Sequence, residues 1–212
     1  MSLIGKIVSY YNLNGNSNDS LSVSNGTDTS VSYVSAKIST GADLNGTTSK
    51  IDLNRTLHST TAGSMSCWVK WDTLAIISRP ITDGAGYIFF DLNGTNKITF
   101  EIYYFGAYSI ASSFTATVGT WYNLVGTWDG TDTNFYIDGA FIGTVAIPGP
   151  QALDLLTLGS TPGYFLDGIV DEVGIWDAAL TAGEVTTLYN GGDGLTYPFT
   201  VSTQNSNFFQ FF

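Results

Sequence analysis

The chain has 212 residues, of which 43% are hydrophobic and 12% charged, and 18 acidic against 7 basic residues give a formal net charge of -11. This length favours one globular domain, and the apolar content excludes a disordered polymer. So acidic a chain repels a phosphate backbone, and the sequence has no membrane-spanning stretch, so we expect no nucleic-acid partner and no membrane insertion.

Short segments rich in Ile, Val, Phe, Tyr and Thr alternate along the chain with Asn-Gly and Asp-Gly dipeptides, which supply the positive φ angles of tight hairpins. The segments that we predict as strands include KIDL (50–53), SMSCWVKW (64–71), GYIFFDL (86–92), KITFEIYY (97–104) and WYNLVGTW (121–128). In KITFEIYY, Ile98, Phe100 and Ile102 alternate with polar residues, as in a strand with one buried face. TNFYIDGAFIG reads as a hairpin that turns at Asp138-Gly139. Many short strands at close spacing favour an antiparallel β-sandwich.

One helix is predicted, over residues 181–189. Thr181 can cap its N-terminus, and Glu184 three residues on completes a capping box. Its apolar positions share one face that can dock on the sandwich: Val185, Leu188 and Tyr189.

We divide the chain into a domain of residues 1–199 and an apolar C-terminal tail of residues 200–212. The tail ends in four aromatic residues, Phe208, Phe209, Phe211 and Phe212. A soluble monomer rarely leaves such a cluster bare. The tail can pack on its own sandwich or on a neighbouring chain. We favour the neighbouring chain, and this predicts self-association through the tail.

Three segments carry a longer pattern: YYNLNGNSNDS followed by GADLNGTTSKIDL, then GTWYNLVGTWDGTDTNFYIDGAFIG, then FLDGIVDEVGIWDAALTAGEVTTLYN. Together they span most of residues 8–190 and resemble the concanavalin A-like, laminin G-like jelly-roll family. The resemblance implies an all-β fold, a two-sheet antiparallel jelly-roll β-sandwich with one short C-terminal helix. Because this sandwich hosts lectins, adhesion modules, lyases and hydrolases alike, the resemblance leaves function open.

Hydrolysis on this fold requires two carboxylates on the groove side of a sheet. Asp171 and Glu172 are adjacent, so on a regular strand they point to opposite faces. Glu101 has no carboxylate two positions away, and we expect Asp91, near the intervening Asn-Gly turn, to lie far from it. We therefore expect no catalytic residue and no enzyme.

Sugar binding requires aromatic faces that stack on sugar rings, beside polar groups that bond the hydroxyls. The predicted ligand-binding residues lie in or near the central strands: Arg79, Tyr87, Glu101, Tyr103, Tyr104 and Tyr108. For each tyrosine the alternative is a packing role with the hydroxyl in water. We assign Trp68, Trp121 and Trp128 to the sandwich interior, because they lie in packing segments of the family.

The resemblance also implies a structural calcium ion between the opening Asn/Asp loop and the closing strand. Asp19 and Asp171 are then the candidate ligands, with backbone carbonyls near Asn12 and Asn16 completing the shell. The alternative is that NGNSNDS is an ordinary turn and that Asp171 only bonds backbone.

Three functions stay open. The first is a non-catalytic carbohydrate-binding or adhesion module that recognises a polysaccharide or surface glycan. The second is a polysaccharide hydrolase or lyase of the same fold, and the third is a sugar-independent structural module of a phage or surface protein. By the resemblance we prefer the first, in an extracellular, cell-surface or virion-associated protein of which this chain forms a part.

Overall fold

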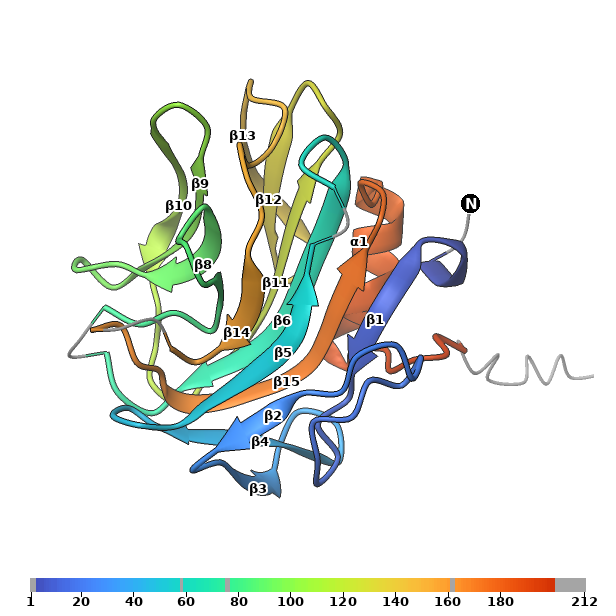
Figure 1. Cartoon of the computed structure of the whole chain (residues 1–212). Helices are drawn as coiled ribbons and strands as arrows, with labels where there is room; N and C mark the ends of the chain where they lie inside the picture. The colour runs from blue at the N-terminus through green and yellow to red at the C-terminus, as the bar shows by residue number, and fades with distance from the viewer. Residues whose placement is uncertain (1–2, 58, 75–76, 161–162, 201–212) are drawn as a thin grey trace, which may run out of the picture.

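The computed structural model describes residues 3–57, 59–74, 77–160 and 163–200. In this part of the chain two antiparallel sheets pack face to face, and an α-helix lies outside them (Figure 1). The predicted two-sheet sandwich with one short C-terminal helix is confirmed.

The eight-stranded sheet has the order β13-β12-β11-β6-β15-β4-β3, and β1 also pairs with β15. Its strands are β1 (Ile7–Tyr11), β3 (Ser32–Ser35), β4 (Thr40–Asn45), β6 (Gly63–Trp71), β11 (Trp121–Trp128), β12 (Thr133–Ile137), β13 (Ala140–Val145) and β15 (Asp167–Trp176). Strand β15 is central because its first half pairs with β4 and its second half with β1, while β6 runs along its other side. The hairpin predicted to turn at Asp138-Gly139 is β12 and β13.

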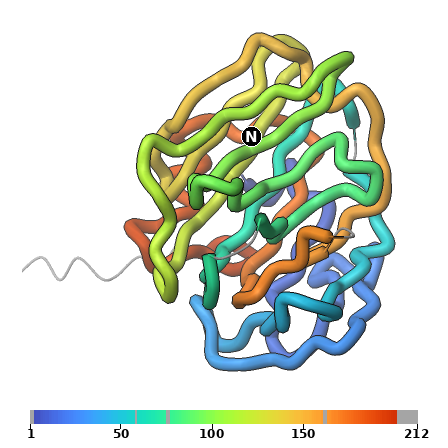
Figure 2. Tube along the Cα trace, turned by 90° about the vertical axis from the view of Figure 1, so that its left-hand side faces the viewer, coloured from blue at the N-terminus to red at the C-terminus, as the bar shows by residue number. Residues whose placement is uncertain are grey.

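The seven-stranded sheet has the order β10-β9-β8-β7-β14-β5-β2. Its strands are β2 (Thr27–Thr29), β5 (Lys50–Thr56), β7 (Ile81–Asp83), β8 (Ile88–Leu92), β9 (Lys97–Tyr103), β10 (Ala107–Thr115) and β14 (Leu155–Leu158). Figure 2 views the molecule from the side of this sheet, with the green strands β8 to β10 toward the viewer.

The core lies between the sheets and follows the period-two alternation of the strands. On β9, Ile98, Phe100 and Ile102 are buried between the sheets, whereas Glu101 is half-buried and Tyr103 is exposed. This is the alternation predicted from the sequence. The opposite face of β9 therefore points away from the core.

A cluster of three phenylalanines joins the two sheets. The rings of Phe90, Phe100 and Phe135 lie with their centroids 5.2 to 5.8 Å apart. Gly126 on β11 leaves the space for this cluster, since a Cβ there would lie 2.3 Å from Cζ of Phe100. Large rings of one sheet thus pack where the facing strand carries no side chain.

The helix α1 (Ala182–Tyr189) packs on the outer face of the eight-stranded sheet (Figure 1). The predicted capping box is present: Glu184 N donates to Thr181 Oγ1 at 3.3 Å, and Thr181 N donates to the Glu184 carboxylate at 2.8 Å. Lys6 binds the same carboxylate at 2.6 Å, which ties the helix to the start of the chain. Short 3₁₀ turns lie at Leu3–Gly5 and Asn190–Gly192.

The tryptophans divide between the two faces of the eight-stranded sheet. Trp128 lies in the core, as expected. The assignment of Trp68 and Trp121 to the interior is wrong. Trp68 is buried, but its ring stacks on Tyr189 of α1 at 5.7 Å on the outer face, and the half-exposed Trp121 lies near Lys70. Both occupy strand positions whose parity points outward.

The segment after the helix packs on the same outer face. Leu195 and Phe199 are buried against Tyr10 and Trp176. The predicted tail lies outside the described residues apart from Thr200, so its role in self-association stays a prediction. None of the helices in the described part of the chain has the length and hydropathy needed to cross a bilayer.

Candidate functional site

The two outer faces of the sandwich differ in what covers them. On the eight-stranded sheet, Tyr10 and Trp176 lie in an apolar cluster with Val185 and Leu188 of α1. No helix in the described part of the chain covers the outer face of the seven-stranded sheet, which we call the open face (Figures 1 and 2). Arg79 and Tyr164, however, cover the part of this face around Phe89.

One row of paired residues crosses the whole open face. Each member is paired in register with the next: Ser109, Glu101, Phe89, Thr82, Thr157, Asp52 and Thr27. The row consists of hydroxyl and carboxylate side chains with one aromatic ring. Six inter-strand spacings of about 4.8 Å make it roughly 29 Å long. Thr82 and Thr157 are buried in the middle of the row, so the polar groups that a ligand can reach lie toward its two ends.

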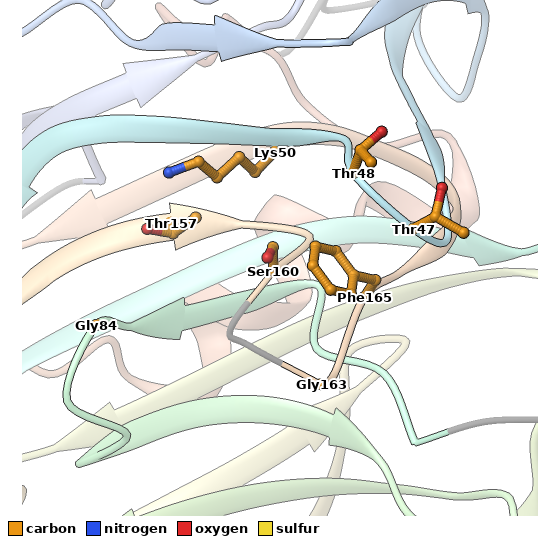
Figure 3. Close-up of a pocket in the computed structure, with 8 residues that line it drawn as sticks. All are labelled: Thr47, Thr48, Lys50, Gly84, Thr157, Ser160, Gly163 and Phe165. Carbon is orange, nitrogen blue, oxygen red and sulfur yellow. The ribbon is translucent and has the colours of Figure 1, made fainter.

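A pocket of about 560 Å³ lies at the β5 and β14 end of this row, within the usual volume of a small-molecule site. It is lined by Thr47, Thr48, Lys50, Gly84, Thr157, Ser160, Gly163 and Phe165. Figure 3 shows Lys50 and Thr157 on neighbouring strands, and Phe165 and Ser160 on the segment between β14 and β15. Nζ of Lys50 bonds Asp52 at 2.7 Å, and Thr157 donates to the other oxygen of Asp52 at 3.2 Å. The pocket lining thus combines an aromatic ring with hydroxyl and ammonium groups, and the Asp52 carboxylate lies beside it, bonded to Lys50 and Thr157.

Arg79 connects the pocket with the rest of the open face. Its guanidinium carbon lies 3.5 Å from the ring centroid of Phe89 on β8 and 4.4 Å from that of Tyr164, which stands between the pocket residues Gly163 and Phe165. Nε of Arg79 is 4.0 Å from the Asp91 carboxylate. Burial lowers the pKa of Arg79, although Asp91 and other acidic groups oppose this shift. Arg79 therefore holds the pocket segment against the sheet.

The four predicted tyrosines separate into two groups. Tyr87 and Tyr103 are linked by a backbone hydrogen bond, and their rings lie 6.1 Å apart on the open face. Tyr104 packs against the core, and Tyr108 pairs with the inward-facing Ile102 although it is 39% exposed. The structure thus brings Arg79, Tyr87, Glu101 and Tyr103 onto the open face. Tyr104 and Tyr108 lie at positions that alternate toward the opposite face of the sheet.

The expectation that Asp91 lies far from Glu101 is wrong. Asp91 pairs with Thr99, and Glu101 pairs with Phe89, so the two carboxylates occupy diagonal positions on one face. Such positions are about 7 to 8 Å apart. Burial raises the pKa of Asp91 to about 7; Arg79 lowers it and Glu101 raises it. The error arose because the Asn93-Gly94 turn is longer than a two-residue hairpin, which shifts the register.

Asp171 and Glu172 do not point to opposite faces as expected. The pairing of β15 with β6 shifts between Asp171 and Gly174, and Glu172 has a φ of 50°, so a β-bulge interrupts the alternation. Glu172 accepts a hydrogen bond from Tyr10 beneath the helix, and burial raises its pKa to about 7. Both carboxylates are buried on the covered side of the eight-stranded sheet, and for this reason they cannot flank a glycosidic bond.

The carboxylates proposed for calcium already accept backbone hydrogen bonds. The two oxygens of Asp19 accept five hydrogen bonds, four of them from backbone N–H groups of its own loop and β1. Asp171 accepts from the backbone N–H of Ile38 at 2.8 Å and of Glu172 at 2.9 Å. In the described residues no three His, Cys, Asp or Glu side chains gather as a metal site would require. This hydrogen bonding fits the alternative of structural carboxylates, and calcium stays a prediction.

Several pocket residues were not predicted from the sequence. Lys50 and Thr157 come from two strands about 100 residues apart, and Phe165 lies on an irregular segment. The alternation in KIDL does place Lys50 and Asp52 on the face opposite Ile51. No local signal, however, pairs β5 with β14.

The model of the concanavalin A-like lectin/glucanases superfamily matches residues 45–186. No curated protein sequence is significantly similar to the chain.

Among solved structures, domain 4 of AbnA, a GH43 extracellular arabinanase from Geobacillus stearothermophilus in complex with arabinotriose, has a TM-score of 0.73 at 23% identity. The match covers 85% of this chain and 97% of that one. The binding domain of Paraclostridial Mosquitocidal Protein 1 has a TM-score of 0.73 at 18% identity, over 90% of this chain and 53% of that one. The botulinum neurotoxin serotype D binding domain has a TM-score of 0.70 at 15% identity, over 89% and 52%. The chain thus spans about half of each toxin domain, and identities this low establish the fold alone.

Proposed function

The chain belongs to the concanavalin A-like lectin/glucanase superfamily, and from this premise we propose that it is a non-catalytic carbohydrate-binding module that holds a glycan on its open face. The observation that carries the proposal is the pocket of about 560 Å³, with Phe165 in its lining, on a face that also presents Tyr87 and Tyr103. Sugar rings offer apolar C–H faces to aromatic rings and hydroxyls to polar side chains. The open face supplies both kinds of partner.

Related structures support this choice of ligand class. One similar domain was solved with arabinotriose, and another similar structure concerns botulinum neurotoxin type C, whose cell entry depends on interaction with two ganglioside molecules. Arabino-oligosaccharides are therefore a sensible first probe. A broad glycan array extends the search to other sugars.

The test compares aromatic residues on and off the open face. For the best glycan hit, Phe165→Ala and Tyr103→Ala should each weaken binding about tenfold in calorimetry, a loss of about 1.4 kcal/mol. Phe141→Ala is the matched control, because Phe141 is 57% exposed on β13 of the other sheet. The proposal fails if no glycan binds, or if Phe141→Ala weakens binding as much as the open-face variants do.

A hydrolase is the second candidate, and one observation favours it. Asp91 and Glu101 share the open face, and burial raises the pKa of Asp91 to about 7, the range of a general acid. Against this function, Asp91 is only 7% exposed and lies near Arg79. We expect no release of reducing ends or unsaturated products from laminarin, alginate, agar or carrageenan. Turnover that disappears in Glu101→Gln would establish the hydrolase or lyase instead.

A further inference from the structure

We infer that the open face selects uncharged sugars and discriminates against glycans that carry carboxylate or sulfate groups. This inference rests on the proposed function and concerns the ligand class of the same site. An anionic sugar is normally recognised by an Arg or Lys whose donors point at the ligand. Both basic side chains around the pocket, Arg79 and Lys50, already contact groups of the protein.

Arg79 is held by the protein itself. Its guanidinium carbon lies 3.5 Å from the ring centroid of Phe89 and 4.4 Å from that of Tyr164, and its Nε is 4.0 Å from the Asp91 carboxylate. Only 15% of the side chain is exposed. A guanidinium in contact with two rings, on a side chain this little exposed, has little surface left for an anionic ligand. Arg79 is thus a positioning residue that braces the pocket segment.

Lys50 is the basic residue of the pocket lining, and it forms a neutral pair with Asp52 at 2.7 Å. The other oxygen of Asp52 accepts a hydrogen bond from Thr157. Such a pair presents a donor next to an acceptor, the pattern that two adjacent sugar hydroxyls complement. An anion at Lys50 would instead lie against the Asp52 carboxylate. Lys97 also starts β9, but three strands lie between β9 and the strand of Lys50, so four inter-strand spacings place it about 19 Å away across the sheet.

The remaining charges around the site are negative. Three acidic residues surround the two basic ones, Asp52, Glu101 and Asp154, and Asp91, whose pKa burial raises to about 7, adds part of a charge at neutral pH. Asp83 is fully buried beside the pocket residue Gly84, and both Asp154 and Arg79 interact with it electrostatically. The whole chain carries a formal net charge of -11. An approaching anion is therefore repelled both locally and at a distance.

The first experiment uses the wild-type protein and glycan probes that differ in charge. An array carries uncharged arabinan, galactan, xylan and β-glucan oligosaccharides, together with polygalacturonate, its carboxyl-reduced form and heparin. We expect every probe that binds to be uncharged, with polygalacturonate and heparin at least about tenfold weaker than the best of them. Raising the salt from about 0.05 to about 0.5 M should leave the affinity for the uncharged probe nearly unchanged, because no ion pair is screened.

Asp52→Asn supplies the second experiment, because it frees Lys50 from its carboxylate partner. The variant should lose affinity for the best uncharged probe and gain affinity for polygalacturonate, each by about tenfold. Asp132→Asn is the matched control: it removes the same charge from an exposed turn between β11 and β12. Its affinity for both probes should stay that of the wild type.

The outcomes separate this inference from the proposed function. Polygalacturonate or heparin that binds the wild type at least as tightly as any uncharged probe, and competes with it, overturns the inference and leaves carbohydrate binding in place. The same conclusion follows if Asp52→Asn folds and changes both affinities in the same direction. Binding of no glycan at all overturns the proposed function and the inference with it.

Discussion

Replacing Asp91 by Asn tests how the buried charges of the open face affect stability. Asp91 is 7% exposed on β8, and one of its oxygens has no hydrogen-bond partner among the described residues. Burial raises its pKa from 3.8 to about 7, while Arg79 lowers it and Glu101 raises it. The folded protein therefore binds this proton more tightly than the unfolded chain does.

The sign and size of the effect follow from proton linkage. A raised pKa contributes stability that is complete below about pH 4 and is lost as the pH rises through about 7. At pH 5 Asp91 is already ionised in the unfolded chain. In the folded chain it ionises only near pH 7, so the stabilisation falls over about two pH units between pH 5 and pH 8. At 1.36 kcal/mol per unit the wild type loses about 3 kcal/mol from Asp91 alone. Burial also raises the pKa values of Asp83, Asp138, Asp171 and Glu172, which act in the same direction.

Urea unfolding of the wild type and of Asp91→Asn at pH 5, 6, 7 and 8 and constant ionic strength measures this loss. The wild type should become less stable from pH 5 to pH 8, and the variant should lose about 3 kcal/mol less over this range. Asp129→Asn is the control, because Asp129 lies in an exposed turn where backbone hydrogen bonds lower its pKa. The reasoning is refuted if Asp91→Asn keeps the full pH dependence, or if the wild type gains stability toward pH 8.

Two further predictions concern calcium and the end of the chain. We expect EDTA to lower the Tm and Ca²⁺ to restore it, because an ion bound only by the native state between Asp19 and Asp171 stabilises that state; an unchanged Tm over millimolar Ca²⁺ would contradict this and leave Asp19, which accepts five hydrogen bonds, as a structural carboxylate. Deleting residues 201–212 should leave the Tm nearly unchanged and shift any oligomer toward monomer in light scattering. Deleting residues 199–212 should lower the Tm, because it also removes the buried Phe199; equal Tm values for the two truncations would contradict this packing.

Local signals in the sequence determined most of the individual elements. The strand predicted over 121–128 is β11, the hairpin turning at Asp138-Gly139 is β12 and β13, and the helix begins at the capping box of Thr181 and Glu184. These features depend on residues a few positions apart. Turn chemistry, period-two alternation and helix capping act over that range, so the sequence alone sufficed.

The sequence could not decide which face of each sheet stays uncovered. Trp68 lies on a strand whose residues are buried on both faces, so its parity alone did not show that α1 covers it. The bulge at Glu172 likewise moved two carboxylates to one side against the regular alternation. Both outcomes depend on partners more than 100 residues away in the chain: Tyr189 for Trp68, and Tyr10 for Glu172.

The candidate site was therefore determined only in part by the sequence. The tyrosines of the central strands and the polar residues near them were predicted as sugar ligands, and the structure places Arg79, Tyr87, Glu101 and Tyr103 on one face. The pocket arises only when β14 pairs with β5 and the segment bearing Phe165 folds beside them. Strand pairing between distant segments depends on the side chains that both sheets bury together, and no stretch of neighbouring residues encodes that pairing.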